Sequence, residues 1–343
     1  MDLLEKLCRT GGISGFEDDV AAIMLKELGR VCDRVEVDGF GNVVGVKGRE
    51  SAGKKKIMIA AHMDEVGFMV KHINKEGFIS FVEIGGIDDR ILLERQVIIK
   101  AKKGDLRGII GSKPPHIQKE EERKKVVEHD EMFIDIGAKD EADAKTMVSV
   151  GDPIIFEPSF GQMANGLYYG KAVDDRLGCW ALIKVMEALK DVDATVYAVA
   201  TAQEEVGLKG ARVAAFKINP DWAFVIDVTI AGDTPQIKET ESALKLGAGP
   251  AITITEASGR GIVTHPKVRE LLRKVAQENN IPYQTDVLEG GMSDGAIIYL
   301  TREGIKTGVV SIPTRYIHGP AGVFHKKDLE NSVELVVKAV NKL

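Results

Sequence analysis

The chain has few cysteines: three among 343 residues, an odd number, at positions far apart in the sequence. A disulfide framework needs paired cysteines, and a structural zinc site of the common kind needs a Cys-x-x-Cys pair, which this sequence lacks. Cys8, Cys32 and Cys179 are therefore expected to be reduced thiols. Because reduced thiols are typical of the cytoplasm, we expect a cytoplasmic protein.

The sequence also lacks a long apolar run and an excess of positive charge. No run approaches the roughly 20 apolar residues that a helix needs to cross a bilayer. Residues 1–6 begin an acidic amphipathic helix rather than a signal peptide. The formal net charge is −6, and the basic residues 123–125 are cancelled by the acidic residues 120–122 before them. We therefore expect neither a membrane nor a nucleic acid as a partner.

What is present has the composition of an ordinary globular protein, with 44% hydrophobic and 29% charged residues. Segments with apolar residues at helical spacing alternate with short, continuous apolar runs. This alternation predicts an α/β fold with a mixed, mostly parallel sheet flanked by helices. The predicted helices cover residues 2–9, 17–30, 176–190, 209–216, 266–279, 295–301 and 327–342, and the predicted strands cover residues 31–37, 42–46, 57–61, 195–202, 222–226, 283–288 and 306–312.

The pattern changes between residues 67 and 161. Short alternating runs are separated there by turns rich in glycine and charge, and the single helical pattern is a short one near residues 141–146. Many short strands at such spacing predict a small β-barrel or sandwich. We therefore divide the chain into a discontinuous α/β domain, residues 1–66 and 162–343, and an inserted β domain, residues 67–161, in which residues 119–131 are expected to be a mobile loop.

Acidic residues and histidines follow several of the predicted strands. The strand over residues 195–202 ends at Glu204 and Glu205, and another strand ends at His62, with Asp64 two residues further on. Ligands bind beyond the carboxyl ends of the strands in open α/β sheets, so these side chains are expected to converge. Taken alone, each motif is more often a solvated charge pair or a histidine hydrogen-bonded at a strand end.

Three further residues have comparable positions. Asp227 follows the strand over residues 222–226, His318 lies in the loop after the last strand, and Asp174 stands before a helix, as an N-cap or a ligand. Two histidines and three carboxylates can hold two divalent ions, and such donors suit zinc, with cobalt or manganese as substitutes. Ions roughly 3.5–4 Å apart can share a hydroxide and polarise a carbonyl. Glu204 is then free to take the proton of that water and pass it to a leaving amine.

In order and context, these motifs resemble those of the tetrahedral aminopeptidases, which are co-catalytic metallo-aminopeptidases also labelled glutamyl aminopeptidase or endoglucanase. The resemblance extends over nearly the whole chain, including an all-β insertion after the first ligand strand, and implies a zinc-peptidase-like fold. Each motif alone is unspecific, and it is their combination that identifies the family. The motifs are His62-x-Asp64, Val173-Asp174-Asp175, Glu204-Glu205, Asp227 and Ile317-His318-Gly319.

The resemblance implies a distribution of ligands over two divalent metal ions. It makes Asp174 the bridging ligand. It places His62 and Asp227 on one ion, and Glu205 and His318 on the other.

Further expectations follow from the same resemblance. Glu204 becomes the general base, and Asp64 orients His62. The bond between Asp174 and Asp175 is expected to be a non-proline cis peptide. The family forms twelve-subunit tetrahedral particles built from dimers through the inserted domain, with active sites facing an inner chamber, and a homo-dodecamer is the assembly that this implies.

The activity implied is that of an aminopeptidase, which removes N-terminal residues from peptides with a free α-amine. Three alternatives stay open. A deacylase or carboxypeptidase on the same fold would capture an acyl group or a carboxylate, but no clear arginine clamp is visible. A glycoside hydrolase uses a pair of carboxylates and would leave the histidines without a role. A non-catalytic scaffold would bind metal without turnover and would not need the general base.

Two further features concern the substrate site and the insertion. Residues 290–295 resemble a glycine-rich substrate-pocket loop of the family, with Met292-Ser293 where Gly-Thr is usual. The residues do not decide between acidic, basic and apolar N-terminal side chains. His116, in the insertion, either reaches a neighbouring subunit's site or has a structural role. The remaining histidines are interpreted as surface or core residues: His72, His129, His265 and His325.

Overall fold

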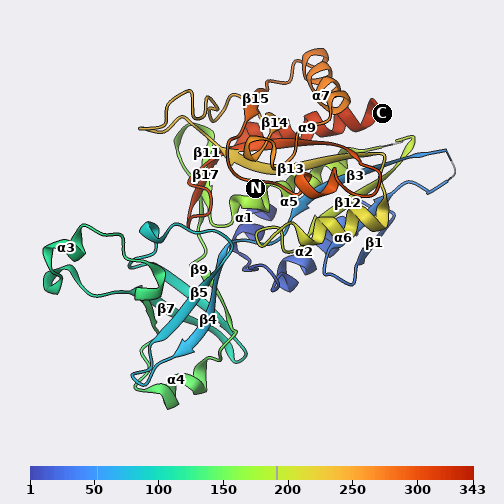
Figure 1. The fold of residues 1–343 in the computed structure, drawn as a ribbon. Helices are drawn as coiled ribbons and strands as arrows, with labels where there is room; N and C mark the ends of the chain where they lie inside the picture. Colours follow the sequence, from blue (N-terminus) through green and yellow to red (C-terminus); the bar gives the residue numbers. More distant parts are fainter. Residues whose placement is uncertain (52, 191) are drawn as a thin grey trace.

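The computed structural model describes residues 1–51, 53–190 and 192–343 and shows two parts, a sheet covered by helices and a separate barrel (Figure 1). Within the described residues the sheet has eleven strands: β1 (Arg34–Val37), β2 (Val43–Lys47), β3 (Lys55–His62), β10 (Phe160–Gln162), β11 (Leu167–Gly170), β12 (Ala194–Thr201), β13 (Trp222–Ile230), β14 (Ala251–Thr255), β15 (Gln284–Val287), β16 (Lys306–Arg315) and β17 (Gly322–His325). The main path runs β1-β2-β12-β3-β13-β16-β17-β11-β10, and β14 pairs with β15 and β16.

The centre of the sheet is parallel. Strands β12, β3, β13 and β16 run in the same direction, whereas most pairs outside them are antiparallel. The predicted α/β fold with a mixed sheet is confirmed. Parallel strands bring their carboxyl ends to one edge of a sheet, and this edge is where the candidate site lies.

Side chains of a strand alternate between the two faces of the sheet, and different helices cover the two faces. In β3, Ile57 and Ile59 belong to the larger core, whereas Met58 and Ala60 belong to the smaller one. Because both faces are buried, the central strands are continuous apolar runs. The larger core includes α1 (Asp2–Arg9), α2 (Asp18–Leu28), α5 (Val173–Ala188), α7 (Pro266–Glu278) and α9 (Lys326–Asn341), and the smaller includes α6 (Lys209–Ile218) and α8 (Gly295–Ile298).

The insertion folds as a closed barrel, as predicted, with strands in the order β4-β5-β8-β7-β6-β9. Its core contains Phe68, which meets Phe81 and Phe156 edge to face. The segment before β8, with α3 (Glu120–Arg123), projects to the left in Figure 1. The domain boundaries and the mobility of residues 119–131 stay predictions. The barrel elements are β4 (Gly67–Ile73), β5 (Ile79–Ile84), β6 (Gln96–Ala101), β7 (Gly104–Gly111), β8 (Phe133–Asp135), β9 (Pro153–Phe156) and the short helix α4 (Glu141–Met147).

The structure differs from the sequence prediction in two respects. The short strands β10, β11, β14 and β17 were not predicted. Asp227 was expected to follow its strand, but β13 continues to Ile230. Pairing of β13 with β3 stops at Val225, whereas pairing with β16 continues to the end of β13. Asp227 therefore lies just beyond the last paired residues of β13 and β3, where its buried carboxylate is close to His62 at the end of β3.

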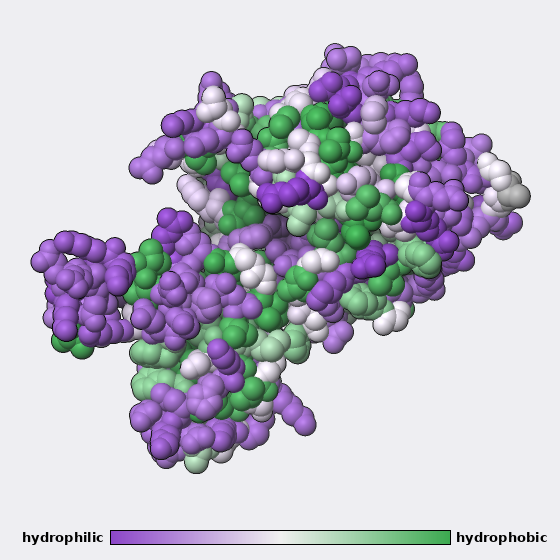
Figure 2. All heavy atoms as spheres, in the orientation of Figure 1, coloured by the Kyte–Doolittle hydropathy of each residue, from purple (hydrophilic) through white to green (hydrophobic). Residues whose placement is uncertain are grey.

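The described surface is mainly hydrophilic, above all on the projecting loop of the barrel (Figure 2). On the face shown in Figure 2, hydrophobic side chains gather between the barrel and the helix-covered sheet. No helix in the described part of the chain is long and apolar enough to span a membrane.

Candidate functional site

The expected residues converge at the carboxyl edge of the parallel strands. Each central strand brings at least one of them, and the N-terminal turn of α5 adds another. His62 is the last residue of β3, Glu204 and Glu205 follow β12, Asp227 lies in β13, His318 follows β16, and Asp174 is the second residue of α5.

Asp174 connects the two histidines. Its Oδ1 lies 3.0 Å from His62 Nε2, and its Oδ2 lies 3.3 Å from His318 Nε2. It does not cap α5, because Ala172 occupies the N-cap position and the carboxylate that accepts a backbone N–H in the first turn is that of Asp175. The peptide bond from Asp174 to Asp175 is cis, as the resemblance implied. One carboxylate oxygen thus faces each imidazole.

Two more carboxylates complete the groups around these histidines. Asp227 Oδ1 lies 3.9 Å from His62 Nε2, and Glu205 Oε1 lies 3.4 Å from His318 Nε2. The result is two clusters of one nitrogen and two oxygens that share Asp174. The division of these side chains between two metal ions stays a prediction.

The second nitrogen of each imidazole faces a backbone carbonyl. His62 Nδ1 lies 3.1 Å from the carbonyl oxygen of Asp64, and His318 Nδ1 lies 2.8 Å from that of Gly86 in the barrel. An N–H that donates to such an acceptor fixes the tautomer and leaves Nε2 free as a metal ligand. The barrel thus orients one histidine of the site.

Asp64 was expected to orient His62 through its carboxylate, which lies 3.6 Å from Nδ1. The shorter contacts of this carboxylate are different. It accepts hydrogen bonds from the backbone N–H groups of Glu204 and Glu205, at 2.9 and 3.1 Å, and from the Ser14 hydroxyl at 2.6 Å. Asp64 therefore holds the turn that carries both glutamates.

The charges of the site indicate whether two divalent ions fit. Burial raises the pKa of Glu205 to about 7 and raises that of Glu204 and Asp227 well above the usual range, so each would prefer to be neutral without a nearby cation. Glu205 Oε1 is buried and lacks a hydrogen-bond donor among the described residues. Ligand atoms about 3.4 Å apart are spaced as in a tetrahedral zinc site. The donor set is of the kind that binds divalent metal ions.

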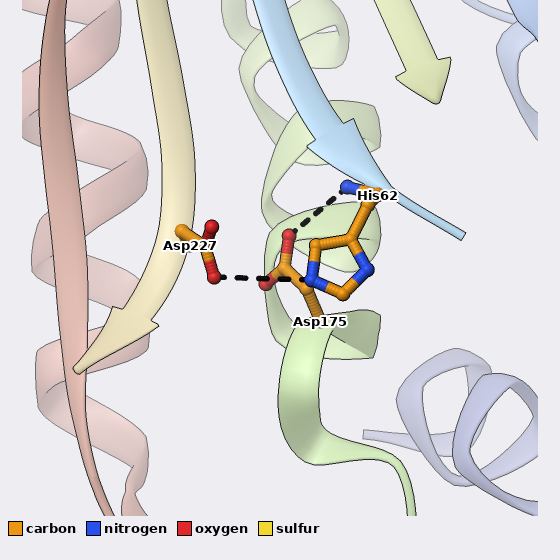
Figure 3. Close-up of side chains that lie close together, drawn as sticks. All are labelled: His62, Asp175 and Asp227. Atoms are coloured by element: carbon orange, nitrogen blue, oxygen red, sulfur yellow. Dashed lines mark hydrogen bonds and ion pairs between the residues drawn. The ribbon is translucent and has the colours of Figure 1, made fainter. Parts of the chain in front are cut away.

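Asp175 is a buried residue that sequence reasoning did not single out for a role (Figure 3). Its Oδ2 accepts a hydrogen bond from the backbone N–H of His62 at 3.2 Å, and its Oδ1 accepts one from Gly178 at 2.8 Å. A side chain at residue 178 would clash, because a Cβ there would lie 2.2 Å from Asp175 Oδ2. Asp175 therefore ties the end of β3 to α5, directly behind Asp227 and His62.

A buried ion network lies beside Asp174 and was also missed. Lys171 Nζ lies 2.6 Å from Glu65 Oε1, and Arg176 Nη2 lies 3.5 Å from the same oxygen. Arg176 also donates to the carbonyl of Leu7 at 3.0 Å. Opposite charges 106 residues apart carry no local sequence signal, so only the fold reveals this network.

The site opens into a cavity of about 310 Å³. All five proposed ligands and Glu204 line it, together with the glycine-rich segment 290–293, in agreement with its resemblance to a substrate-pocket loop. Glu256, which the sequence analysis did not consider, lines it as well. The remaining lining residues are Val228, Thr229, Ile230, Leu288 and Ile317.

The other histidines lie outside this site. His116 is exposed in a short 3₁₀ turn of the insertion, and its proposed reach to a neighbouring subunit stays a prediction. His129 Nδ1 lies 3.2 Å from Asp89 in the barrel. His265 and His325 are the N-caps of α7 and α9, where each ring accepts a backbone N–H.

Comparison with known proteins identifies the family. Residues 41–335 match the family model described as M42 glutamyl aminopeptidase. A lysyl aminopeptidase of Pyrococcus furiosus is 32% identical over 349 residues, covering 100% of this chain and 97% of the relative. A glutamyl aminopeptidase of Lactococcus lactis is 28% identical over 333 residues, covering 95% and 92%.

Solved structures match over the whole chain. An aminopeptidase from the archaeon Desulfurococcus kamchatkensis has a TM-score of 0.95 at 41% identity, covering 100% of this chain and 94% of that one. The TET1 peptidase of Pyrococcus horikoshii, which can assemble into a tetrahedron or a large octahedral shell, has a TM-score of 0.89 at 33% identity, covering 100% and 99%. The chain belongs to the M42 glutamyl aminopeptidase family.

Proposed function

We propose that this aminopeptidase removes N-terminal residues from peptides and that two divalent ions are held by five of its side chains. The observation that carries the proposal is the Asp174 carboxylate, which directs one oxygen to the imidazole of each cluster. The other ring nitrogens of both histidines already face backbone carbonyls, so the Asp174 carboxylate is not needed to orient either imidazole. The proposed ligands are His62, Asp174, Glu205, Asp227 and His318.

In the proposed reaction, Glu204 moves the proton. Its carboxylate is buried at the cavity, 4.0 Å from His62 Nε2, and burial raises its pKa, which suits a group that must accept a proton near neutral pH. Glu204 takes a proton from the attacking water and gives it to the leaving amine. The two ions, when bound, lower the pKa of that water and polarise the scissile carbonyl.

The metal and the location belong to the same proposal. Imidazole and carboxylate donors support zinc as the resident metal, with cobalt or manganese as substitutes. The three cysteines of the chain form no disulfide, which supports a location in the cytoplasm.

The alternatives lack a supporting observation. A carboxypeptidase needs a cation for the substrate's carboxylate, and no lysine or arginine is among the described residues that line the cavity. A glycoside hydrolase would need two carboxylates on opposite sides of a sugar ring, without metal ligands. Here the carboxylates surround two histidines instead.

Hydrolysis of chromogenic amides tests the proposal. Leucyl, glutamyl and lysyl amides, each free and N-acetylated, are offered to chelator-stripped enzyme with zinc or cobalt added back. We expect metal-dependent cleavage of the free-amine forms alone. Release of acetate from the acetylated forms, without release of the chromophore from the free-amine forms, would instead establish a deacylase.

A further inference from the structure

We propose that Glu256 makes this enzyme discriminate against acidic N-terminal side chains, so that peptides beginning with a neutral or cationic residue are its substrates. The inference rests on the proposed aminopeptidase function, because it concerns the part of the same cavity that receives the first side chain of the peptide. The inference concerns this chain and not the family as a whole, because relatives are named for different substrates, one as a lysyl and one as a glutamyl aminopeptidase.

Away from the proposed metal ligands, the described lining residues of the cavity offer an acidic side chain no positive partner. Beyond the proposed ligands its walls are mainly apolar, and no lysine or arginine is among the lining residues in the described part of the chain. A carboxylate that enters such a space loses water without gaining a charged partner, which is unfavourable. The apolar lining residues are Val228, Ile230, Leu288, Met292 and Ile317.

Glu256 adds a negative charge to this wall. It follows β14 and is only 3% exposed. Its Oε1 accepts the hydroxyl hydrogen of Ser293 at 2.6 Å, and its Oε2 accepts the backbone N–H of Ser293 at 3.1 Å. Both donors are neutral, and no ion pair with Glu256 is present among the residues that the structure describes. Burial raises the pKa of Glu256 and the two hydrogen bonds from Ser293 oppose that rise, so neutral donors alone hold the carboxyl group in place.

The same arrangement suits neutral and cationic side chains. A leucyl or methionyl side chain meets apolar walls, and the methylene stem of lysine can follow these walls while its ammonium group faces Glu256. A carboxylate has free lone pairs beyond the two that Ser293 uses. An acidic side chain would instead meet a like charge, and such juxtaposition costs about 100-fold or more in specificity.

The test compares kcat/KM for leucyl, lysyl and glutamyl amides with fully metal-loaded enzyme. We expect the wild-type protein to favour the leucyl and lysyl amides over the glutamyl amide by about 100-fold or more. In Glu256→Gln, the amide oxygen can still accept the Ser293 N–H, so the loop keeps its shape. The glutamyl-to-leucyl ratio should rise about tenfold or more in this variant, and the lysyl-to-leucyl ratio should fall.

Asp328→Asn is the matched control. Asp328 is also a buried carboxylate and accepts hydrogen bonds from the backbone N–H groups of Gly247 and Gly249, at 2.6 and 2.8 Å, but neither it nor these two partners line the cavity. Its substitution should leave the glutamyl-to-leucyl ratio unchanged. Met292→Lys supplies a second variant with little risk to folding, because Met292 is 55% exposed, and it should raise that ratio by placing a cation at the wall.

The outcomes separate this inference from the proposed function. A wild-type enzyme that cleaves the glutamyl amide as well as the leucyl amide would overturn the inference and leave the aminopeptidase assignment intact. An unchanged ratio in folded Glu256→Gln would overturn the role of Glu256. Failure of the metal-loaded wild-type enzyme to cleave any free-amine amide would contradict the proposed function itself.

Discussion

In the proposed site, Asp174 is a ligand of both metal ions, whereas each histidine is a ligand of one. His318 Nε2 faces Asp174 and Glu205, and without it the second ion would retain only oxygen donors. We therefore expect His318→Ala to lower the metal content from two ions per chain toward one, measured by elemental analysis after dialysis. His72→Ala, at an exposed histidine of the barrel, is the control and should keep both ions. Full occupancy in His318→Ala would refute the ligand assignment.

Glu204 and Glu205 are neighbours in the sequence with separate proposed tasks. Glu204→Gln removes the base but no ligand, so kcat should fall by about 10²–10⁴-fold while the metal content stays the same. Glu205→Gln removes a ligand, so it should lower the metal content as well. Steady-state kinetics and elemental analysis on the same preparations distinguish the two effects. A near-normal kcat in Glu204→Gln would remove it from the role of base.

At the scale of residues, the side chains that could be predicted from the sequence are those that stand directly at the end of a predicted strand. His62, Glu204 and Glu205 were expected at the carboxyl edge because a continuous apolar run precedes each of them. The supporting residues were not predicted. Asp175 and Ser14 act through contacts with segments 113 and 50 residues away, and no local pattern encodes such distances.

Among the helices and strands, α5 is the one whose N-terminal segment shapes the site. Lys171 precedes it and is fully buried against Glu65, which also accepts the backbone N–H of Gly12 at 3.0 Å. Lys171→Met should cost about 3–5 kcal/mol of stability, because it leaves the Glu65 charge buried without its main partner. Chemical denaturation of the metal-free protein measures this loss.

An exposed ion pair provides the comparison for Lys171. Lys100 contacts Asp105 at the barrel surface, at 2.8 Å, and the pair is open to solvent. Lys100→Met should therefore cost no more than about 1 kcal/mol. Equal losses for the two variants would show that the network beside α5 is not a determinant of stability.

The strands show which secondary-structure elements can be predicted from the sequence alone. The central strands were predicted because burial on both faces makes them long apolar runs. Strands β10, β11 and β17 are only three or four residues long. β10 and β11 form a hairpin, and β11 pairs with β17, which brings Leu167 opposite His325 from the far end of the chain. Such strands owe their conformation to tertiary pairing rather than to their own composition.

At the scale of the molecule, the strands of the barrel close into a ring, so we expect contacts between subunits through it to use mainly side chains. Ile117 and Val126 lie on its projecting segment and are 67% and 53% exposed. We expect both side chains to be buried where subunits meet, in the homo-dodecamer built from dimers through the inserted domain that the family resemblance implies.

The expected homo-dodecamer has a defined mass, and substitutions in the inserted domain should disrupt the assembly. Twelve chains of 37.3 kDa give a particle of about 450 kDa, which native mass spectrometry or light scattering can measure. Substituting Ile117→Asp and Val126→Asp together should reduce the mass, because two charges would be buried in the contact. Retention of two metal ions per chain shows that such a variant is folded. A particle that keeps its full mass with both substitutions would place the contacts elsewhere, whereas a smaller, metal-loaded particle would assign dimer formation to the barrel.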